Sequence, residues 1–269
     1  MKDGHIHSPY CPHGSSDRFE QYIKKAIEVG VMVMTFTEHF PLPKNFKDPS
    51  PENDSAISED HLLAYFNELK ELKEKYKHSI RINIGVEVDY IEGYEKEIKE
   101  MLDKYGEYID DSILSVHMIK INDEYHLIDY SPEKFGELVD LLGSIENVYY
   151  KYYDTVKMAV NSDLGRYKPR RIGHLNLVRK YNKIYPYDYR GNEKLEEIVR
   201  IVKSKDYELD FNVSGYRKPY CNEAYIDGYL LKLVRDYNVK TILGSDSHTH
   251  DTVGYKMKEY NRLMEELQF

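Results

Sequence analysis

The sequence predicts an α/β fold in which seven strands alternate with helices and close into an irregular (β/α)7 barrel. Short runs of apolar and β-branched residues alternate with longer amphipathic stretches, which is the pattern of strand–helix units around a parallel sheet. The chain has 269 residues, and α/β barrels of about 250 residues commonly form a single domain. Because no repeat, low-complexity tract or flexible linker divides the chain, we expect residues 1–269 to form one domain.

We expect strands at the short apolar runs and helices where apolar residues recur every three or four positions. The predicted strands are 4–7, 31–37, 80–88, 112–116, 171–173, 209–213 and 240–243. The predicted helices are 17–29, 61–77, 94–105, 132–164, 193–203, 222–237 and 254–267. Residues 41–56 contain too many Pro, Asp and Asn for either element, so we expect a loop that covers one face of the barrel.

Composition narrows the class of protein. The 38 Lys and Arg residues against 47 Asp and Glu residues give a formal net charge of −9, which argues against a nucleic-acid-binding protein. Only two cysteines are present, Cys11 and Cys221, so a disulfide-framed secreted scaffold is excluded and we expect reduced thiols in the cytoplasm. No run approaches the roughly 20 apolar residues of a membrane span. Residues 1–10 have no signal-peptide core, so we expect no membrane partner.

Imidazole and carboxylate side chains stand at or just after the ends of six predicted strands. They are His5, His7, Glu38, His39, Glu87, Asp89, His117, His174, Asp246 and His248. The carboxyl ends of parallel barrel strands form one rim, which is where barrel enzymes place their chemistry. We therefore expect these side chains to meet at one mouth of the barrel.

The spacing and chemistry of these residues favour metal ions. His5 and His7 are two residues apart and therefore point to the same side of a strand. Asp246 and His248 share this spacing, provided that the chain stays extended beyond the last predicted strand. Imidazole nitrogen and carboxylate oxygen suit Zn²⁺, Fe²⁺ or Mn²⁺. The donors are too many for one tetrahedral ion, so two or three metals fit better.

Six motifs in this sequence resemble those of the polymerase and histidinol phosphatase family, in the same order. They are DGHIHSPYCPHG (3–14), TEHFP (37–41), GVEVDY (85–90), SVHMI (115–119), IGHLNLV (172–178) and GSDSHT (244–249). The first motif, with CPHG after its two histidines, is typical of the histidinol-phosphatase branch of the family.

The resemblance implies a distorted (β/α)7 barrel with a metal site of three divalent ions, zinc, iron or manganese, at the carboxyl-terminal rim of the strands. Carried over by position, the ligands are His5, His7, Glu87 and Asp246 for the first ion, Glu87, His117 and His174 for the second, and His13, His39 and His248 for the third. The resemblance further implies a phosphomonoesterase that hydrolyses L-histidinol phosphate in histidine biosynthesis. A hydroxide that bridges two ions would attack the phosphorus, because metals lower the pKa of bound water.

Asp246 and His248 are the catalytic candidates within this set. Besides binding metal, Asp246 is placed to relay a proton toward the leaving alkoxide or from the attacking water. The role of Asp246 as a proton relay is a hypothesis, and it does not extend to His248.

Cationic side chains would complete a pocket for phosphate, which a planar guanidinium binds in a bidentate manner. Arg217 and Lys218 follow the sixth predicted strand, Arg166 precedes the fifth, and Arg18 and Asp17 lie near the first motif. Arg166 and Arg217 are favoured about equally, although Arg217 and Lys218 are explained as well by solvated surface charges. The expected partner is a small phosphate monoester, and no feature of the sequence indicates an oligomeric state.

Two other functions stay open at this point. A metal-dependent phosphodiesterase or exonuclease would use the same rim, although a strand-binding groove needs a positive surface that this acidic chain does not suggest. A non-catalytic metal-binding accessory module is the other alternative, and such a module is expected to lose ligands.

Two further features have structural explanations that we prefer. Cys11 is expected to be a packed thiol rather than a nucleophile, because no activating setting is visible around it. Tyr149, Tyr152 and Tyr153 have helical spacing and are expected to pack in the core or against another subunit.

Overall fold

The computed structural model of the protein describes residues 1–267 and contains a sheet of seven strands. In sheet order these strands are β1 (Lys2–Ile6), β2 (Val33–His39), β3 (Arg81–Asp89), β4 (Asp111–Ser115), β7 (Arg171–Ile172), β8 (Glu208–Asn212) and β9 (Thr241–Gly244). Every neighbouring pair in this sheet is parallel. Because all these pairs are parallel, the carboxyl ends of the seven strands lie at the same edge.

The two outer strands approach each other and nearly close the sheet into a barrel. Ile6 and Ser247 form an isolated parallel bridge, and the His7 N–H donates to the Ser247 carbonyl at 2.9 Å. The closure is irregular, because the register between β1 and β2 shifts between Asp3 and Ile6. The predicted α/β barrel is confirmed. That residues 1–269 form a single domain stays a prediction.

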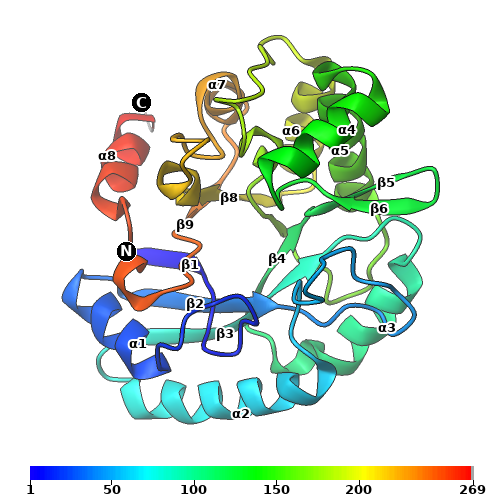
Figure 1. Cartoon of the computed structure of the whole chain (residues 1–269). Helices are drawn as coiled ribbons and strands as arrows, with labels where there is room; N and C mark the ends of the chain where they lie inside the picture. The colour runs from blue at the N-terminus through cyan, green and yellow to red at the C-terminus, as the bar shows by residue number, and fades with distance from the viewer. Residues whose placement is uncertain (268–269) are drawn as a thin grey trace.

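Helices surround the strands on the outside of the barrel (Figure 1). They are α1 (Phe19–Glu28), α2 (Glu59–Tyr76), α3 (Glu95–Tyr105), α4 (Pro132–Leu142), α5 (Ile145–Asn161), α6 (Glu193–Ser204), α7 (Gly228–Asp236) and α8 (Met257–Leu267). In α2, for example, Leu62, Phe66 and Leu69 are buried on one face, and the Ser58 hydroxyl caps the first turn. No helix within residues 1–267 combines the length and the apolarity that a membrane crossing requires.

Two predicted helices differ from the structure. The predicted helix 132–164 is wrong, because Gly143 has a φ of 81° and ends α4 in the left-handed conformation. The Ser144 side chain then begins α5 by accepting a hydrogen bond from the Asn147 N–H at 3.1 Å. The predicted helix 222–237 begins too early, since α7 starts only at Gly228. The other predicted helices and strands lie within a few residues of the observed ones.

A β-hairpin that the sequence prediction missed follows β4. Strands β5 (Met118–Ile121) and β6 (Glu124–Leu127) are antiparallel. Between them, Asn122 and Asp123 have φ angles of 49° and 66°, as the two-residue turns of tight hairpins require.

The tyrosines of α5 pack in the core, as one of the two sequence-based explanations predicts. Tyr149, Tyr152 and Tyr153 are fully buried. The Tyr153 hydroxyl donates to the Asn176 side chain at 2.7 Å. This contact holds the segment after β7, which carries His174.

Candidate metal centre

The predicted rim residues do meet at the carboxyl ends of the strands. His5 lies in β1, His39 ends β2, and Glu87 lies near the end of β3. His117 and His174 each lie two residues beyond the last residue of their strands, β4 and β7. Most of these side chains line a cavity of about 520 Å³, and the fully buried His5 lies 3.3 Å from two of the lining side chains, His7 and Glu87.

Glu87 lies between two pairs of histidines. Its Oε2 atom is 3.3 Å from Nε2 of His5 and 3.4 Å from Nε2 of His7. Its Oε1 atom is 3.0 Å from Nε2 of His174 and 3.7 Å from Nε2 of His117. Because each oxygen faces a different pair, Glu87 has the geometry of a carboxylate that bridges two ions.

The separations between donor atoms fit a metal site. Ligand atoms that lie 2.0–2.1 Å from a tetrahedral zinc ion are about 3.3–3.4 Å from one another. The Nε2 atoms of His5 and His7 are 3.3 Å apart, and Oδ1 of Asp246 is 3.3 Å from Nε2 of His7. The Nε2 atoms of His117 and His174 are 3.0 Å apart. The donors are therefore close enough to share ions and are of the types that zinc, iron and manganese accept.

Buried carboxylates orient two of these histidines. Nδ1 of His5 donates to Asp210 at 2.8 Å, and Nδ1 of His117 donates to Asp89 at 2.6 Å. Each bond fixes the tautomer in which Nε2 is free to bind a metal, as is common for metal-binding histidines. Sequence reasoning missed Asp210, although an Asp between the apolar residues Leu209 and Phe211 was a signal for a partnered buried charge.

Asp246 reaches the site through a left-handed backbone conformation. Its φ is 52°, so the condition that the chain stays extended through Asp246 and His248 is not met. Asp tolerates this region better than most residues, and the turn lets the Asp246 N–H donate to the His5 carbonyl at 2.7 Å. Ser214 and Asn212 donate to Oδ2 of Asp246 at 2.9 and 3.2 Å. Its Oδ1 atom is left to face the histidines.

The three histidines predicted for a third ion lie near one another, but less closely than the donors around Glu87. The ring of His13 is 5.0 Å from that of His39 and 5.2 Å from that of His248. His13 is exposed, and its Nδ1 atom donates to the Asp54 carbonyl at 2.9 Å. His39 is buried and, within residues 1–267, neither of its ring nitrogens has a hydrogen-bond partner.

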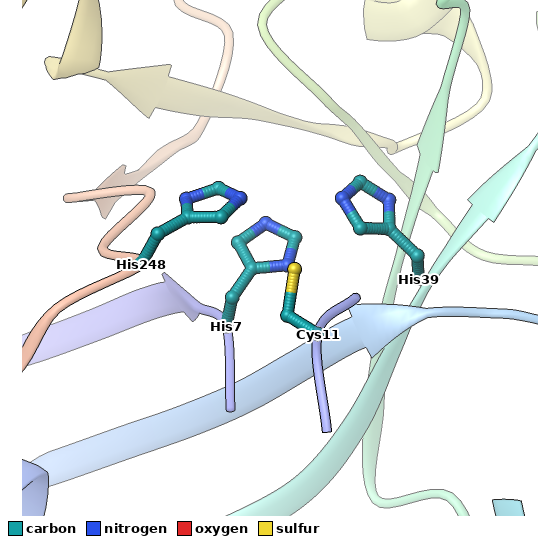
Figure 2. Close-up of side chains that lie close together, drawn as sticks. All are labelled: His7, Cys11, His39 and His248. Atoms are coloured by element: carbon teal, nitrogen blue, oxygen red, sulfur yellow. The ribbon is translucent and has the colours of Figure 1, made fainter. Parts of the chain in front are cut away.

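A thiol lies within the same group. Donor atoms of His7, Cys11, His39 and His248 all lie within 4.8 Å of one another. Figure 2 shows the three imidazoles around the Cys11 sulfur. Sequence reasoning did not place Cys11 among the metal donors.

The charges in the site favour cations. Burial would lower the pKa of His5, but the carboxylates of Glu87 and Asp210 raise it to about 10. Burial also opposes a charge on His117, whose pKa Asp89 and Glu87 raise to about 10. Burial would raise the pKa of Glu87, yet His5 and His117 hold it well below its ordinary value. The negative groups thus stabilise positive charge at several adjacent points.

Two of the predicted substrate-binding cations line the cavity. They are Arg217 and Lys218, which follow β8. Nη2 of Arg217 donates to the carbonyls of Ser245 and Asp246 at 2.7 and 3.1 Å. Its Nη1 atom is buried and has no partner in the part of the chain that the structure describes. Lys180, which the sequence analysis did not single out, also lines the cavity and pairs with Asp129 at 2.8 Å.

The structure does not bring Arg166, Arg18 or Asp17 into this cavity. Arg166 precedes β7 and so lies at the end of that strand opposite the metal donors; its side chain is 70% exposed and 3.7 Å from Glu107. Arg18 is exposed at the start of α1. Asp17 accepts a hydrogen bond from the His250 N–H at 2.8 Å. Their positions give no support to a substrate-binding role, which stays a prediction for all three.

The predicted loop 41–56 contains no helix or strand and contributes Ser50, Glu52, Asp54 and Ser55 to the cavity wall. Its position at the cavity agrees with a loop that covers one face. That it moves over a bound substrate stays a prediction.

The fold and the site together define an α/β barrel whose rim gathers histidine and carboxylate groups that could hold metal ions. The PHP domain family matches residues 3–214, and the chain belongs to this family. A histidinol-phosphatase of Bacillus subtilis (strain 168) is 42% identical over 263 residues, which cover 96% of this chain and 97% of that protein. A probable histidinol-phosphatase of Deinococcus radiodurans is 26% identical and covers 96% of this chain and 90% of that protein.

Two crystal structures share the fold. A protein of Listeria monocytogenes, crystallised as a candidate histidinol phosphatase, has a TM-score of 0.93 and 34% identity, covering 97% of this chain and all of that one (100%). The histidinol phosphate phosphatase of Lactococcus lactis, crystallised with zinc, L-histidinol and phosphate, has a TM-score of 0.69 and 23% identity. That match covers 100% of this chain and 94% of the Lactococcus chain.

Proposed function

We propose that this protein is a metal-dependent phosphatase that hydrolyses L-histidinol phosphate to L-histidinol and phosphate, a reaction of histidine biosynthesis. The relative from Bacillus subtilis, a histidinol-phosphatase that is 42% identical over nearly the whole chain, supports the proposal. The observation that carries it is one cavity in which cationic side chains stand beside the donor atoms around Glu87.

The proposed centre holds three divalent ions, of zinc, iron or manganese. The first is assigned to His5, His7, Glu87 and Asp246, the second to Glu87, His117 and His174, and the third to His13, His39 and His248. When bound, such ions lower the pKa of a water molecule and neutralise charge on phosphoryl oxygens. Three divalent ions with the carboxylates of Glu87 and Asp246 carry about +4, which attracts a phosphate monoester of about −1.5 to −2.

Arg217 is the best candidate for direct contact with the phosphate. It lines the cavity, and two carbonyls fix its Nη2 atom. Its Nη1 atom, which has no partner within residues 1–267, needs an acceptor, because a buried charged donor without one is costly. Lys218 and Lys180 add positive charge to the same cavity.

The remainder of the substrate carries an amine and an imidazole, so it calls for negative and polar groups. Carboxylates of Glu52 and Asp54 in the loop 41–56, and of Asp129 after the hairpin, line the cavity together with the cations. A substrate with an anionic end and a cationic end matches such a mixture of charges better than a nucleic-acid strand does.

Asp246 is the proposed proton relay. Ser214 and Asn212 hold its Oδ2 atom, so Oδ1 is presented on the side of the histidines. From there Oδ1 is placed to take a proton from the attacking water and return it to the leaving alkoxide. His248, whose Nδ1 atom is 3.5 Å from Oδ1 of Asp246, is the second catalytic candidate.

The test is a substrate panel on the purified protein loaded with zinc, iron or manganese, together with a metal analysis. Release of phosphate from L-histidinol phosphate, without cleavage of a single-stranded oligonucleotide, is the expected result. Cleavage of the oligonucleotide would favour the phosphodiesterase alternative, and no turnover of either would favour a non-catalytic module. Glu87→Gln is expected to abolish turnover and to lose metal, whereas the exposed Glu71→Gln on α2 serves as the matched control.

A further inference from the structure

We infer that Cys11 is a metal ligand, and that its thiolate binds the third ion together with His39 and His248. This inference rests on the metal-dependent function proposed above, and it adds a sulfur donor to a site otherwise made of nitrogen and oxygen. It also replaces the explanation of Cys11 as an inert packed thiol.

The position of the sulfur carries the inference. Sγ of Cys11 and ring nitrogens of His7, His39 and His248 lie within 4.8 Å of one another (Figure 2). Nε2 of His7 already faces Glu87, at 3.4 Å. Nδ1 of His39 also lies 3.5 Å from Oε2 of Glu87, but the assignment above uses His7 for the first ion, which leaves Cys11, His39 and His248 for a further one.

A tight turn fixes the thiol in this place. The Cys11 N–H donates to the Ser8 carbonyl at 3.0 Å, and the Gly14 N–H donates to the Cys11 carbonyl at 3.0 Å. A Cβ atom on Gly14 would lie only 2.9 Å from Cβ of Cys11, so the close approach needs glycine at this position. Cys11 itself is 6% exposed.

The unpartnered imidazole beside the thiol is an independent observation. His39 is 6% exposed, and neither of its nitrogens has a hydrogen-bond partner among residues 1–267. Burying such a polar group without a partner costs free energy, so an imidazole in this position indicates a ligand. His13 donates from Nδ1 to the Asp54 carbonyl and lies outside the 4.8 Å group, but it keeps its assignment to the third ion, to which Cys11 is an additional donor.

A sulfur donor has a predictable effect on metal choice. A thiol loses its proton to the solvent when it binds a metal, so it brings one negative charge to the site. Thiolate favours zinc, whereas carboxylate and imidazole donors alone also suit manganese. The site with Cys11 should therefore select zinc more strongly than the sites around Glu87.

Cobalt gives a direct readout that does not depend on phosphatase activity. The metal-free protein is titrated with Co²⁺, and near-ultraviolet absorption reports bonds between sulfur and cobalt. The wild type and Cys221→Ser are expected to show a sulfur-to-cobalt band, and Cys11→Ser to lack it. Cys221 is a matched control, since it is also buried but its thiol donates to the Glu223 carbonyl at 3.7 Å.

Zinc retention against a chelator is the second measurement. Cys11→Ser, and Cys11→Ala as a variant without any donor, are expected to release one zinc ion at least about 10-fold more readily than the wild type. Circular dichroism establishes that each variant is folded. Visible cobalt absorption without a sulfur band in the wild type, or a band that persists in Cys11→Ser, would overturn the inference alone. A wild-type protein that binds no cobalt or zinc would overturn the metal centre and the proposed function as well.

Discussion

Nδ1 of His5 donates to Oδ2 of Asp210 at 2.8 Å, and both side chains are completely buried. The bond turns Nε2 of His5 toward Glu87 and His7. Within residues 1–267, the other proposed ligand that hydrogen-bonds to Asp210 is His174, whose backbone N–H donates at 3.4 Å. The Asn212 side chain also donates to Asp210, at 3.0 Å, and in turn supports Asp246.

We expect Asp210→Ala to weaken metal binding by about 10- to 100-fold, because removal of a carboxylate that orients a ligand has this effect in metalloproteins. The measurement is competition with a chelator, followed by metal analysis. Asp206→Ala is the control, since Asp206 forms an exposed ion pair with Lys240. Equal metal affinity in the Asp210 variant and the wild type would contradict the orienting role.

Gly244 allows this contact by its small size. A Cβ atom there would lie 1.9 Å from Oδ1 of Asp210 and 2.8 Å from Cβ of His5. Gly244→Ala is expected to lower the free energy of unfolding by about 1–3 kcal/mol and to lower metal content. At Gly191, which has a φ of 73°, an added Cβ atom would meet no atom of residues 1–267 within 4 Å, so Gly191→Ala should destabilise the protein without loss of metal. Thermal melts and metal analysis test both variants, and normal metal content in Gly244→Ala would contradict this account.

Substitutions at Arg217 and Arg166 distinguish between the two arginines that the sequence analysis favours as phosphate contacts. Arg217→Ala is expected to lower kcat/KM for L-histidinol phosphate by about 10- to 100-fold, since hydrogen bonds to charged groups contribute about 1.5–3 kcal/mol. Arg217→Lys should restore only part of this loss, because lysine lacks the bidentate geometry. Arg166→Ala should leave the kinetics unchanged, and a large defect in that variant would contradict the placement of Arg166 outside the cavity.

The proton-relay role of Asp246 has its own test. Asp246→Asn, prepared with its metal content measured, is expected to lower kcat by about 10²- to 10⁴-fold, which is the usual contribution of a general acid or base. A change in KM that is smaller than the change in kcat would indicate that substrate binding is retained. Full metal occupancy with an unchanged rate would rule out the proton relay.

The stability of the metal-free protein should depend on pH through His5 and His117. Their pKa values are raised to about 10 in the fold, against about 6.5 in an unfolded chain. The folded state therefore binds more protons, so the stabilisation is complete below about pH 6.5 and is lost as the pH rises toward 10. Zinc takes the place of these protons and binds more tightly as their concentration falls.

We accordingly expect the Tm of the chelated protein to decrease as the pH rises from 7 to about 9.5. Over the same range the difference in Tm between the zinc-loaded and the chelated protein should increase. Thermal melts of both samples in the same buffers provide the measurement. A difference in Tm between the two samples that decreases with rising pH would contradict this explanation.

The sequence predicted the barrel and the gathering of its rim residues, because both follow from local patterns. The alternation of strand and helix patterns defines the sheet, and ligands such as His5 and His7 inherit their position from strand periodicity. Local chemistry also marked the hairpin turn at Asn122 and Asp123, which was overlooked.

Features that depend on the path of the chain between elements could not be predicted in this way. The left-handed conformation at Asp246 follows from closure of β9 against β1, and the approach of Cys11 to His39 follows from a turn after β1. The position of Arg166, by contrast, could have been predicted, because a residue that precedes a strand lies at its amino-terminal end, away from the metal donors.

The central claim is that this barrel is a metal-dependent histidinol-phosphatase. The most direct test is the rate of phosphate release from L-histidinol phosphate by one preparation before chelation, after chelation and after readdition of zinc. The account predicts turnover that is lost on chelation and restored by zinc in proportion to bound metal, with no cleavage of an oligonucleotide. Turnover that survives complete removal of metal, or none in the fully loaded protein, would contradict it.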